Sequence, residues 1–128
     1  VQLEKGSTAT DFEYVDYGRQ LQQCQRYCFS LAGNSGNIVG LGFTGTTVSG
    51  TIGVAFPVEM RVLPTLVSSL ININDSQALY TGTSVSLAYS GALKFNALFV
   101  AISGGVVGRG CQAYWAANNS KAIFSAEL

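Results

Sequence analysis

The side chains that usually carry enzyme chemistry are scarce in this chain of 128 residues. It contains no histidine, so the commonest general base is missing, and with it the commonest partner of a serine or cysteine nucleophile. Gly-x-Ser-x-Gly and Ser-x-x-Lys patterns are absent as well. Cleavage of a glycosidic bond needs two carboxylates, but five of the seven acidic residues lie near the chain ends. We therefore expect that the chain is not an enzyme.

Neither the cysteines nor the glycine-rich stretch 104–110 predicts a cofactor or metal site. Cys24 and Cys28 lie four residues apart in a segment with helical spacing, where side chains share a face without facing each other. We expect buried free thiols, since metal binding would need further ligands at fixed spacing. The stretch 104–110 lies between two expected strands, so the helix N-terminus that holds a phosphate is missing.

Charge is distributed unevenly, with seven of the fourteen charged residues in the first 26 positions. The remainder is a nearly neutral body rich in Gly, Ser and Thr, which we expect to bury surface against copies of itself. A net charge of zero without basic clusters argues against nucleic acid and anionic membrane surfaces. No apolar run is long enough to span a bilayer, and the first residues lack a secretory leader pattern. We interpret the chain as a piece of a longer protein, because Val1 is not a natural start.

One helix is expected near the N-terminus. Large or apolar side chains recur at intervals of three and four from Tyr17 to Leu31, which is the spacing of one helical stripe. Asp16 precedes the stripe as a possible N-cap. The pattern predicts a helix of about two to three turns that ends before Gly33.

After Gly33 the chain alternates short apolar runs with turn residues, a pattern typical of strands. The predicted strands are Ile38–Phe43, Thr51–Phe56, Val58–Leu63, Thr65–Ile73, Ser84–Tyr89, Leu93–Ile102, Cys111–Ala116 and Ala122–Ala126. Eight strands with frequent turns predict an all-β, jelly-roll-like antiparallel sandwich with one short N-terminal helix. Pro57 and Pro64 withhold donors, so we expect the strand between them at an edge or a bulge.

Two stretches, Leu66–Val67 and Ala97–Ile102, are apolar on both faces of their expected strands. A lone antiparallel sandwich usually exposes one face of each sheet to water, so such strands indicate a partner that covers the second face. A second copy of the chain is the simplest partner. The alternative is a central strand of a monomeric sandwich, because short apolar runs are ambiguous.

Sugars are typically bound by an aromatic face together with amide and carboxylate groups, and two clusters offer this combination. The first consists of Tyr114, Trp115, Asn118 and Asn119. The alternative for this cluster is that its two aromatic residues alternate on a strand, with one in the core. The second consists of Asn74, Asp75 and Tyr80, with Gln77 in the same loop, and its alternative is an ordinary turn.

Several motifs along the chain, taken together, resemble a known family. The residues that carry the resemblance most specifically are Tyr17, Gly18, Leu21, Cys24, Gln25, Arg26 and Tyr27. Further matching stretches are Val1–Glu4, Phe56–Arg61 and Phe124–Leu128. In this order they resemble the C-terminal domain of many bacteriophage tail fibre and tailspike proteins, over essentially the whole chain. The resemblance implies a β-rich knob at the tip of a trimeric fibre in the virion.

The resemblance also implies a division of the chain. Residues 1–13 would be a linker or the trailing strand of an upstream module, and 14–128 the C-terminal β-sandwich domain. Arg19–Gln20 depart from the family pattern, which often has acidic residues there, and Asp11 replaces a common proline. We expect Arg26 to act structurally, through a carboxylate or carbonyl groups in the fold or in a contact between chains.

The resemblance implies two functions. One is binding host surface polysaccharide or lipopolysaccharide, and the other is holding three chains together as a homotrimer. Weak sugar sites gain from such an assembly, because three sites can engage one surface at once. We expect both functions, without a cofactor. The alternatives are a purely structural trimerisation cap and a lectin-like module of a bacterial surface protein.

Overall fold

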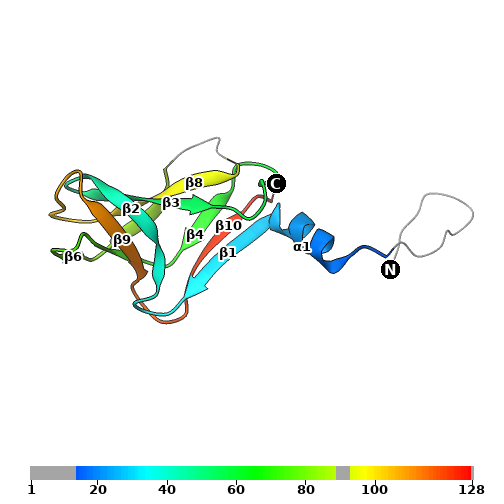
Figure 1. Ribbon diagram of the computed structural model, residues 1–128, viewed down its shortest axis with the longest axis horizontal. Coiled ribbons are helices and arrows are strands. Elements are labelled where there is room, and N and C mark those ends of the chain that lie inside the picture. Colours follow the sequence, from blue (N-terminus) through cyan, green and yellow to red (C-terminus); the bar gives the residue numbers. More distant parts are fainter. Residues whose placement is uncertain (1–13, 89–92, 128) are drawn as a thin grey trace, which may run out of the picture.

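Two packed β-sheets with one short helix outside them make up the fold (Figure 1). The structure is a computed structural model that describes residues 14–88 and 93–127. The predicted linker at 1–13 lies outside the described residues. The elements are α1 (Tyr17–Gln25), β1 (Cys28–Gly33), β2 (Ile38–Thr46), β3 (Ser49–Ala55), β4 (Thr65–Ser68), β5 (Ile71–Asn74), β6 (Leu79–Tyr80), β7 (Ser84–Leu87), β8 (Phe95–Ala101), β9 (Gly110–Trp115) and β10 (Ser120–Ser125).

Strand pairing divides the molecule into a small and a large sheet. The small sheet has the order β1-β10-β4, and the large sheet has the order β6-β5-β9-β2-β3-β8-β7. Every pairing between the described strands is antiparallel. The predicted all-β sandwich with one short N-terminal helix is confirmed.

The core lies between the sheets and is built from alternate residues of their strands. Phe29, Phe56 and Phe124 form an aromatic cluster whose ring centroids lie 5.0 to 6.0 Å apart. Ile52 and Leu98, paired across β3 and β8, are fully buried in the same core. Each such side chain contributes about 1.5–3 kcal/mol by burial. The intervening residues of each strand necessarily face outward.

The helix begins as predicted but packs on almost nothing. The Asp16 carboxylate accepts a hydrogen bond from the Gly18 N–H at 2.9 Å and so caps the first turn. No residue of α1 is buried, and Figure 1 shows it beyond the end of the sandwich. The side chains of Tyr17 and Leu21, members of the predicted stripe, are exposed. In the described part of the chain, no helix is long and apolar enough to cross a membrane.

The end of the Cys-Gln-Arg-Tyr motif attaches the helix to the sandwich. The Arg26 carbonyl accepts from the Arg61 N–H at 2.9 Å, and the Tyr27 carbonyl accepts from the Ala126 N–H at 2.7 Å. The Arg61 guanidinium also lies 5.5 Å from the centroid of the Tyr27 ring, as a cation–π contact. Arg26 thus acts through its backbone, and no ion pair to its side chain occurs among the described residues.

Beyond Arg26 the helix prediction fails, because Cys28 begins β1 instead of extending α1. Phe29 and Leu31 are half-buried against the core, whereas Ser30 and Ala32 are exposed, which is the period of a strand. This segment pairs with β10 along its whole length. Its apolar residues fit both periods, and the tertiary pairing decides between them.

The predicted strand Val58–Leu63 is wrong, because this segment is a loop between the sheets. Phe56 donates its N–H to the Lys94 carbonyl at 2.9 Å, and Met60 donates to the Leu93 carbonyl at 2.8 Å. The segment thus makes isolated backbone hydrogen bonds and does not pair with a neighbouring strand, consistent with the two prolines that bracket it. Its Met60 side chain is buried and fills the end of the core.

The predicted strand Thr65–Ile73 is in fact two strands, β4 and β5, which belong to different sheets. The chain crosses between the sheets at Ser69 and Leu70. There the Ser69 N–H donates to the Lys121 carbonyl at 2.8 Å, and the Leu70 carbonyl accepts from the Ala116 N–H at 3.1 Å. Sequence pattern alone does not mark this corner, because both halves are apolar.

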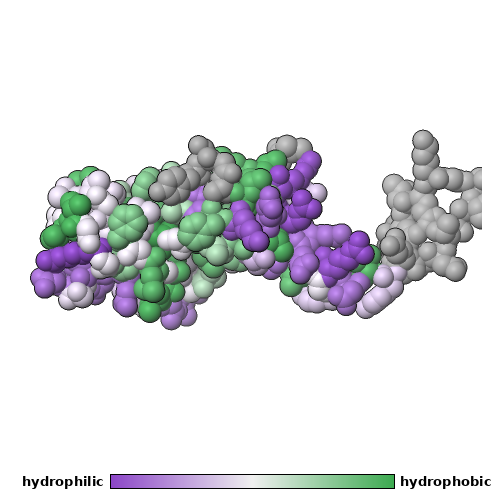
Figure 2. All heavy atoms as spheres, turned by 45° about the horizontal axis from the view of Figure 1, so that its top comes forward, coloured by the Kyte–Doolittle hydropathy of each residue, from purple (hydrophilic) through white to green (hydrophobic). Residues whose placement is uncertain are grey.

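The strands that were predicted to be apolar on both faces each expose apolar side chains on one face in the single chain. In β8, Leu98 and Val100 are buried, whereas Phe95 and Phe99 on the other side are 57% and 36% exposed. Val67 of β4 is 69% exposed. Figure 2 shows apolar side chains at the surface of the sandwich body, with hydrophilic ones on α1 and at the two ends of the sandwich.

Candidate functional site

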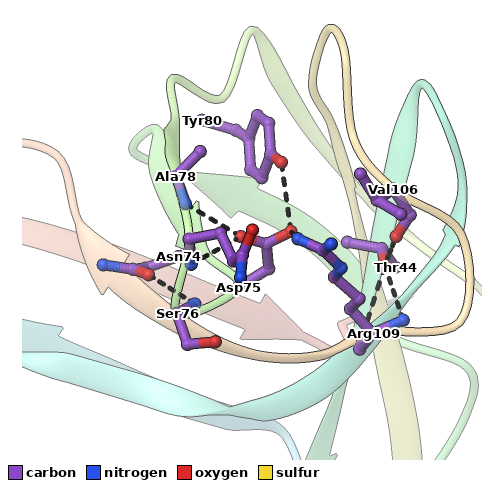
Figure 3. A network of polar contacts seen from close by, with 9 residues as sticks. Thr44, Asn74, Asp75, Ser76, Ala78, Tyr80, Val106 and Arg109 are labelled. Carbon is purple, nitrogen blue, oxygen red and sulfur yellow. Dashed lines mark hydrogen bonds and ion pairs between the residues drawn. The ribbon is translucent and has the colours of Figure 1, made fainter.

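The Asp75 carboxylate is buried in the turn between β5 and β6, where four donors surround it (Figure 3). Its Oδ1 accepts from the backbone N–H groups of Gln77 at 3.1 Å and Ala78 at 3.0 Å. Its Oδ2 accepts from the Tyr80 hydroxyl at 3.1 Å and lies 3.3 Å from Nη1 of Arg109. This network closes the turn and attaches it to Arg109, the residue before β9.

The same donors stabilise the charged form of the carboxylate. The Ala78 N–H contributes most to holding the pKa of Asp75 below its ordinary value, whereas desolvation opposes the shift. Desolvation, followed by the neighbouring Asp75 charge, raises the pKa of Tyr80. Asp75 is therefore an ionised structural anchor that holds this turn together with Tyr80, as the alternative expected, and sugar binding by these two residues stays a prediction.

Thr44 extends this network to the loop between β8 and β9. Its hydroxyl donates to the Val106 carbonyl and accepts from the Arg109 N–H at 3.2 Å (Figure 3). Its backbone N–H donates to the Arg109 carbonyl at 2.9 Å. Thr44 is fully buried, and its hydrogen bonds hold the backbone of Arg109 in place. The guanidinium of Arg109 is the positive charge that faces Asp75.

The first predicted sugar-binding cluster is divided by the structure. Trp115 is 3% exposed and packs in the core, where a Cβ added to Gly33 would lie 2.5 Å from its Cδ1. The prediction that Trp115 stacks on a sugar is therefore wrong for the folded chain. Tyr114, the next residue along β9, lies half-buried on the opposite side of the large sheet.

Asn118 and Asn119 lie in the turn between β9 and β10. The Asn118 Oδ1 accepts from the Ser35 N–H at 3.1 Å, and the Asn119 N–H donates to the Asn34 side chain at 3.1 Å. Asn119 has a φ of +56°, a left-handed conformation that Asn tolerates. These two residues connect two turns, and Asn119 also lines a shallow hollow of about 410 Å³.

Tyr114 instead belongs to a group of polar side chains on the outer face of β5 and β9. Strand register places Asn72 directly opposite Tyr114, and Asn74 directly opposite Gln112. Directly paired residues have Cβ atoms about 4.5–5.5 Å apart, so the four side chains form a compact square. We call Asn72, Asn74, Gln112 and Tyr114 the polar half of this face.

Within the polar half, the chain itself occupies the oxygen of each carboxamide. The Asn72 Oδ1 accepts from the Gly82 N–H at 3.2 Å, and the Asn74 Oδ1 accepts from the Ser76 N–H at 2.8 Å. The Gln112 Oε1 accepts from the Tyr114 hydroxyl, which holds the tyrosine ring along β9. The amide nitrogens of Asn72, Asn74 and Gln112 have no partner among the described residues. They remain as hydrogen-bond donors.

Two shallow hollows lie over the polar half and share Asn74. The first hollow, of about 530 Å³, is lined by Leu41, Gly42, Asn74, Ser76, Gly110, Cys111 and Gln112. The second hollow, of about 270 Å³, is lined by Ser35, Gly36, Asn72, Asn74, Leu79, Tyr114 and Trp115. Together they reach the range of small-ligand sites, with apolar and amide groups side by side.

The rest of this outer face is mostly apolar. On β2, β3 and β8 it includes Phe43, Gly53, Ala55, Phe95 and Phe99, which we call the apolar half, and the buried Thr51 lies between Phe43 and Phe99. Phe43 is 51% exposed and Phe95 is 57% exposed. Leu41, opposite Gln112, marks the boundary between the two halves.

The cysteines offer no comparable site. Cys24 and Cys28 are exposed free thiols, contrary to the prediction of burial, because α1 and the start of β1 lie outside the core. Cys111 is buried, and desolvation raises the pKa of its thiol. Within residues 14–88 and 93–127, no three Cys, Asp or Glu side chains are grouped to hold a metal ion.

Comparison with protein-family models, with curated proteins and with solved structures finds no match to this chain. Function must therefore be argued from the residues of this molecule and the arrangement described above.

Sequence reasoning identified Tyr114 and Asn74 but missed Asn72 and Gln112. A signal for Asn72 was present, because Asn72 and Asn74 alternate with Ile71 and Ile73, as expected for a strand with one buried face. The pairing of β5 with β9 was the missing information. It joins residues about forty positions apart, and no local pattern predicts it.

Proposed function

We propose that this chain is the C-terminal domain of a bacteriophage tail fibre or tailspike, which binds glycan on the host cell surface and caps a homotrimer. In this role it would act at the fibre tip in the virion. The resemblance centred on Tyr17–Tyr27 motivates the class of protein. The observation that supports glycan binding is the polar half, in which an aromatic ring lies among amide donors in a shallow depression.

The chemistry of the polar half suits a sugar. The ring of Tyr114 offers an apolar surface to sugar C–H groups, and the free amide nitrogens can donate to hydroxyl oxygens. The hollows are open, which suits a weak contact with an extended surface polymer. Three such sites on one trimer would strengthen attachment by avidity.

The apolar half supports the second part of the proposal. Exposed aromatic side chains such as Phe43 and Phe95 are costly to leave in water, and contiguous apolar patches usually mark interaction sites. Copies of the same chain would cover them through equivalent surfaces. The polar half of each chain would then lie at the periphery of the trimer.

The exposed helix is a second observation that supports trimerisation. An isolated helix of nine residues is marginal in water, and α1 receives no burial from its own chain. Its stripe, which includes Tyr17 and Leu21, would gain stability by packing against the same stripe in neighbouring chains. This observation also favours the alternative function, a structural cap without receptor contact.

One experiment separates these functions. The purified chain is tested for binding to host cells and to a glycan array, and its mass in solution is measured by light scattering. A trimer that binds glycans or cells supports the proposal. A trimer that binds neither supports the structural cap, and a monomer that binds glycan supports a lectin-like module.

A further inference from the structure

The polar half also indicates which kind of glycan fits. Resting on the proposed function, we propose that it binds an uncharged oligosaccharide rich in hydrogen-bond acceptors, with successive sugar units in the first and second hollows on either side of Asn74. Unsubstituted hexoses and N-acetylhexosamines belong to this class. Sugars that carry carboxylate, sulfate or phosphate groups do not.

The first reason is the state of the carboxamides. Asn72, Asn74 and Gln112 each have their oxygen occupied by a donor of the chain, so only their NH₂ groups remain for a ligand. A ligand that satisfies them must therefore supply acceptors. Hydroxyl oxygens and the carbonyl of an acetamido group are acceptors that neutral sugars carry.

The second reason is the absence of usable charge. No residue that lines the first or the second hollow is charged. Arg109, the cation next to Gly110, lies 3.3 Å from the Asp75 carboxylate and is neutralised by it. An anionic sugar would lose water here without gaining a counter-ion, which is unfavourable. The site therefore selects against acidic glycans.

The third reason is the shape of the row across the strands. Leu41, Gln112, Asn74 and Leu79 are successive partners on β2, β9, β5 and β6. Four adjacent strands span about 14 Å, which is wider than one sugar ring. Leu41 and Leu79, at the two ends, are 66% and 62% exposed and offer apolar surface to sugar C–H groups. Asn74 lies between them and lines both hollows.

The test compares two probes on the purified chain by calorimetry. One is a neutral N-acetylhexosamine trisaccharide, and the other is a trisaccharide of the same length that carries uronic acids. We expect the neutral probe to bind at least tenfold more tightly. Asn74→Asp keeps the acceptor for the Ser76 N–H but loses the donor, so it should weaken binding of the neutral probe about 3- to 10-fold or more.

Gln112→Glu is the second variant, because Gln112 is exposed and its replacement leaves the core untouched. It keeps an acceptor for the Tyr114 hydroxyl and should also weaken binding about 3- to 10-fold. Gln22→Glu, on the exposed surface of α1, is the matched control for charge and should bind like the wild type. Asn118→Asp should also bind nearly like the wild type, since Asn118 lines neither hollow and Asp keeps the acceptor for the Ser35 N–H.

The outcomes distinguish this inference from the function on which it rests. If the acidic probe binds better, or if Asn118→Asp abolishes binding while Asn74→Asp and Gln112→Glu do not, the neutral site is wrong but glycan binding stands. If neither probe, no array glycan and no host cell is bound, the proposed function fails, and the inference fails with it.

Discussion

The polar and apolar halves of the outer face share one sheet but differ in what they leave unsatisfied. The polar half leaves amide nitrogens without partners among the described residues, and the apolar half leaves the rings of Phe43 and Phe95 exposed to water. A ligand with acceptors would satisfy the amide nitrogens, and another apolar surface would cover the exposed rings. One sheet can therefore serve two partners, because alternation along each strand separates its outer face from the core that holds it.

The largest effect is expected from truncating a core side chain of the sheet that carries both halves. Trp115→Ala deletes a buried indole on the inner side of β9 and should lower the free energy of unfolding by about 3–5 kcal/mol. Urea denaturation measures this loss. Tyr114→Ala, on the outer face of the same strand, is the comparison and should change the stability by much less. Equal losses would contradict the assignment of Trp115 to the core.

Acid should destabilise the turn between β5 and β6, next to the polar half, because it protonates Asp75. Its pKa is lowered in the folded state, so its stabilising contribution is complete above the ordinary value of 3.8 and is lost as the pH falls below it. Denaturation at neutral pH and near pH 3 measures the loss. Asp75→Asn, which cannot titrate there, should be less stable than the wild type at neutral pH and should lose less on acidification. An unchanged acid dependence would show that other carboxyl groups are responsible.

The smallest effect is expected at Tyr114, on the outer side of the same strand. Tyr114→Ala should lower affinity for a bound glycan about 3- to 10-fold, with little change in stability. Tyr114→Phe removes the hydroxyl that donates to Gln112 but keeps the ring, and it should retain most of the affinity. If Tyr114→Phe loses as much as Tyr114→Ala, the ring is not the contact surface.

The sequence predicts the fold class well and the site only in part. Alternation identifies most strands of the large sheet, and Asp16 marks the start of α1, because these are local signals. The loop from Phe56 to Pro64 and the β4–β5 corner were misassigned, since their fate depends on contacts with distant strands. Trp115 was expected at a surface because aromatic residues suit both sugars and cores, and only burial separates the two roles.

The proposed function depends above all on the trimer, because we propose that copies of the chain cover the apolar half. Light scattering at micromolar concentration tests for the trimer, with wild type, Phe43→Asp and Gln112→Glu measured together. We predict the mass of three chains for wild type and Gln112→Glu, and a folded monomer for Phe43→Asp. A wild-type chain that is folded and monomeric at this concentration would show that the trimer is wrong.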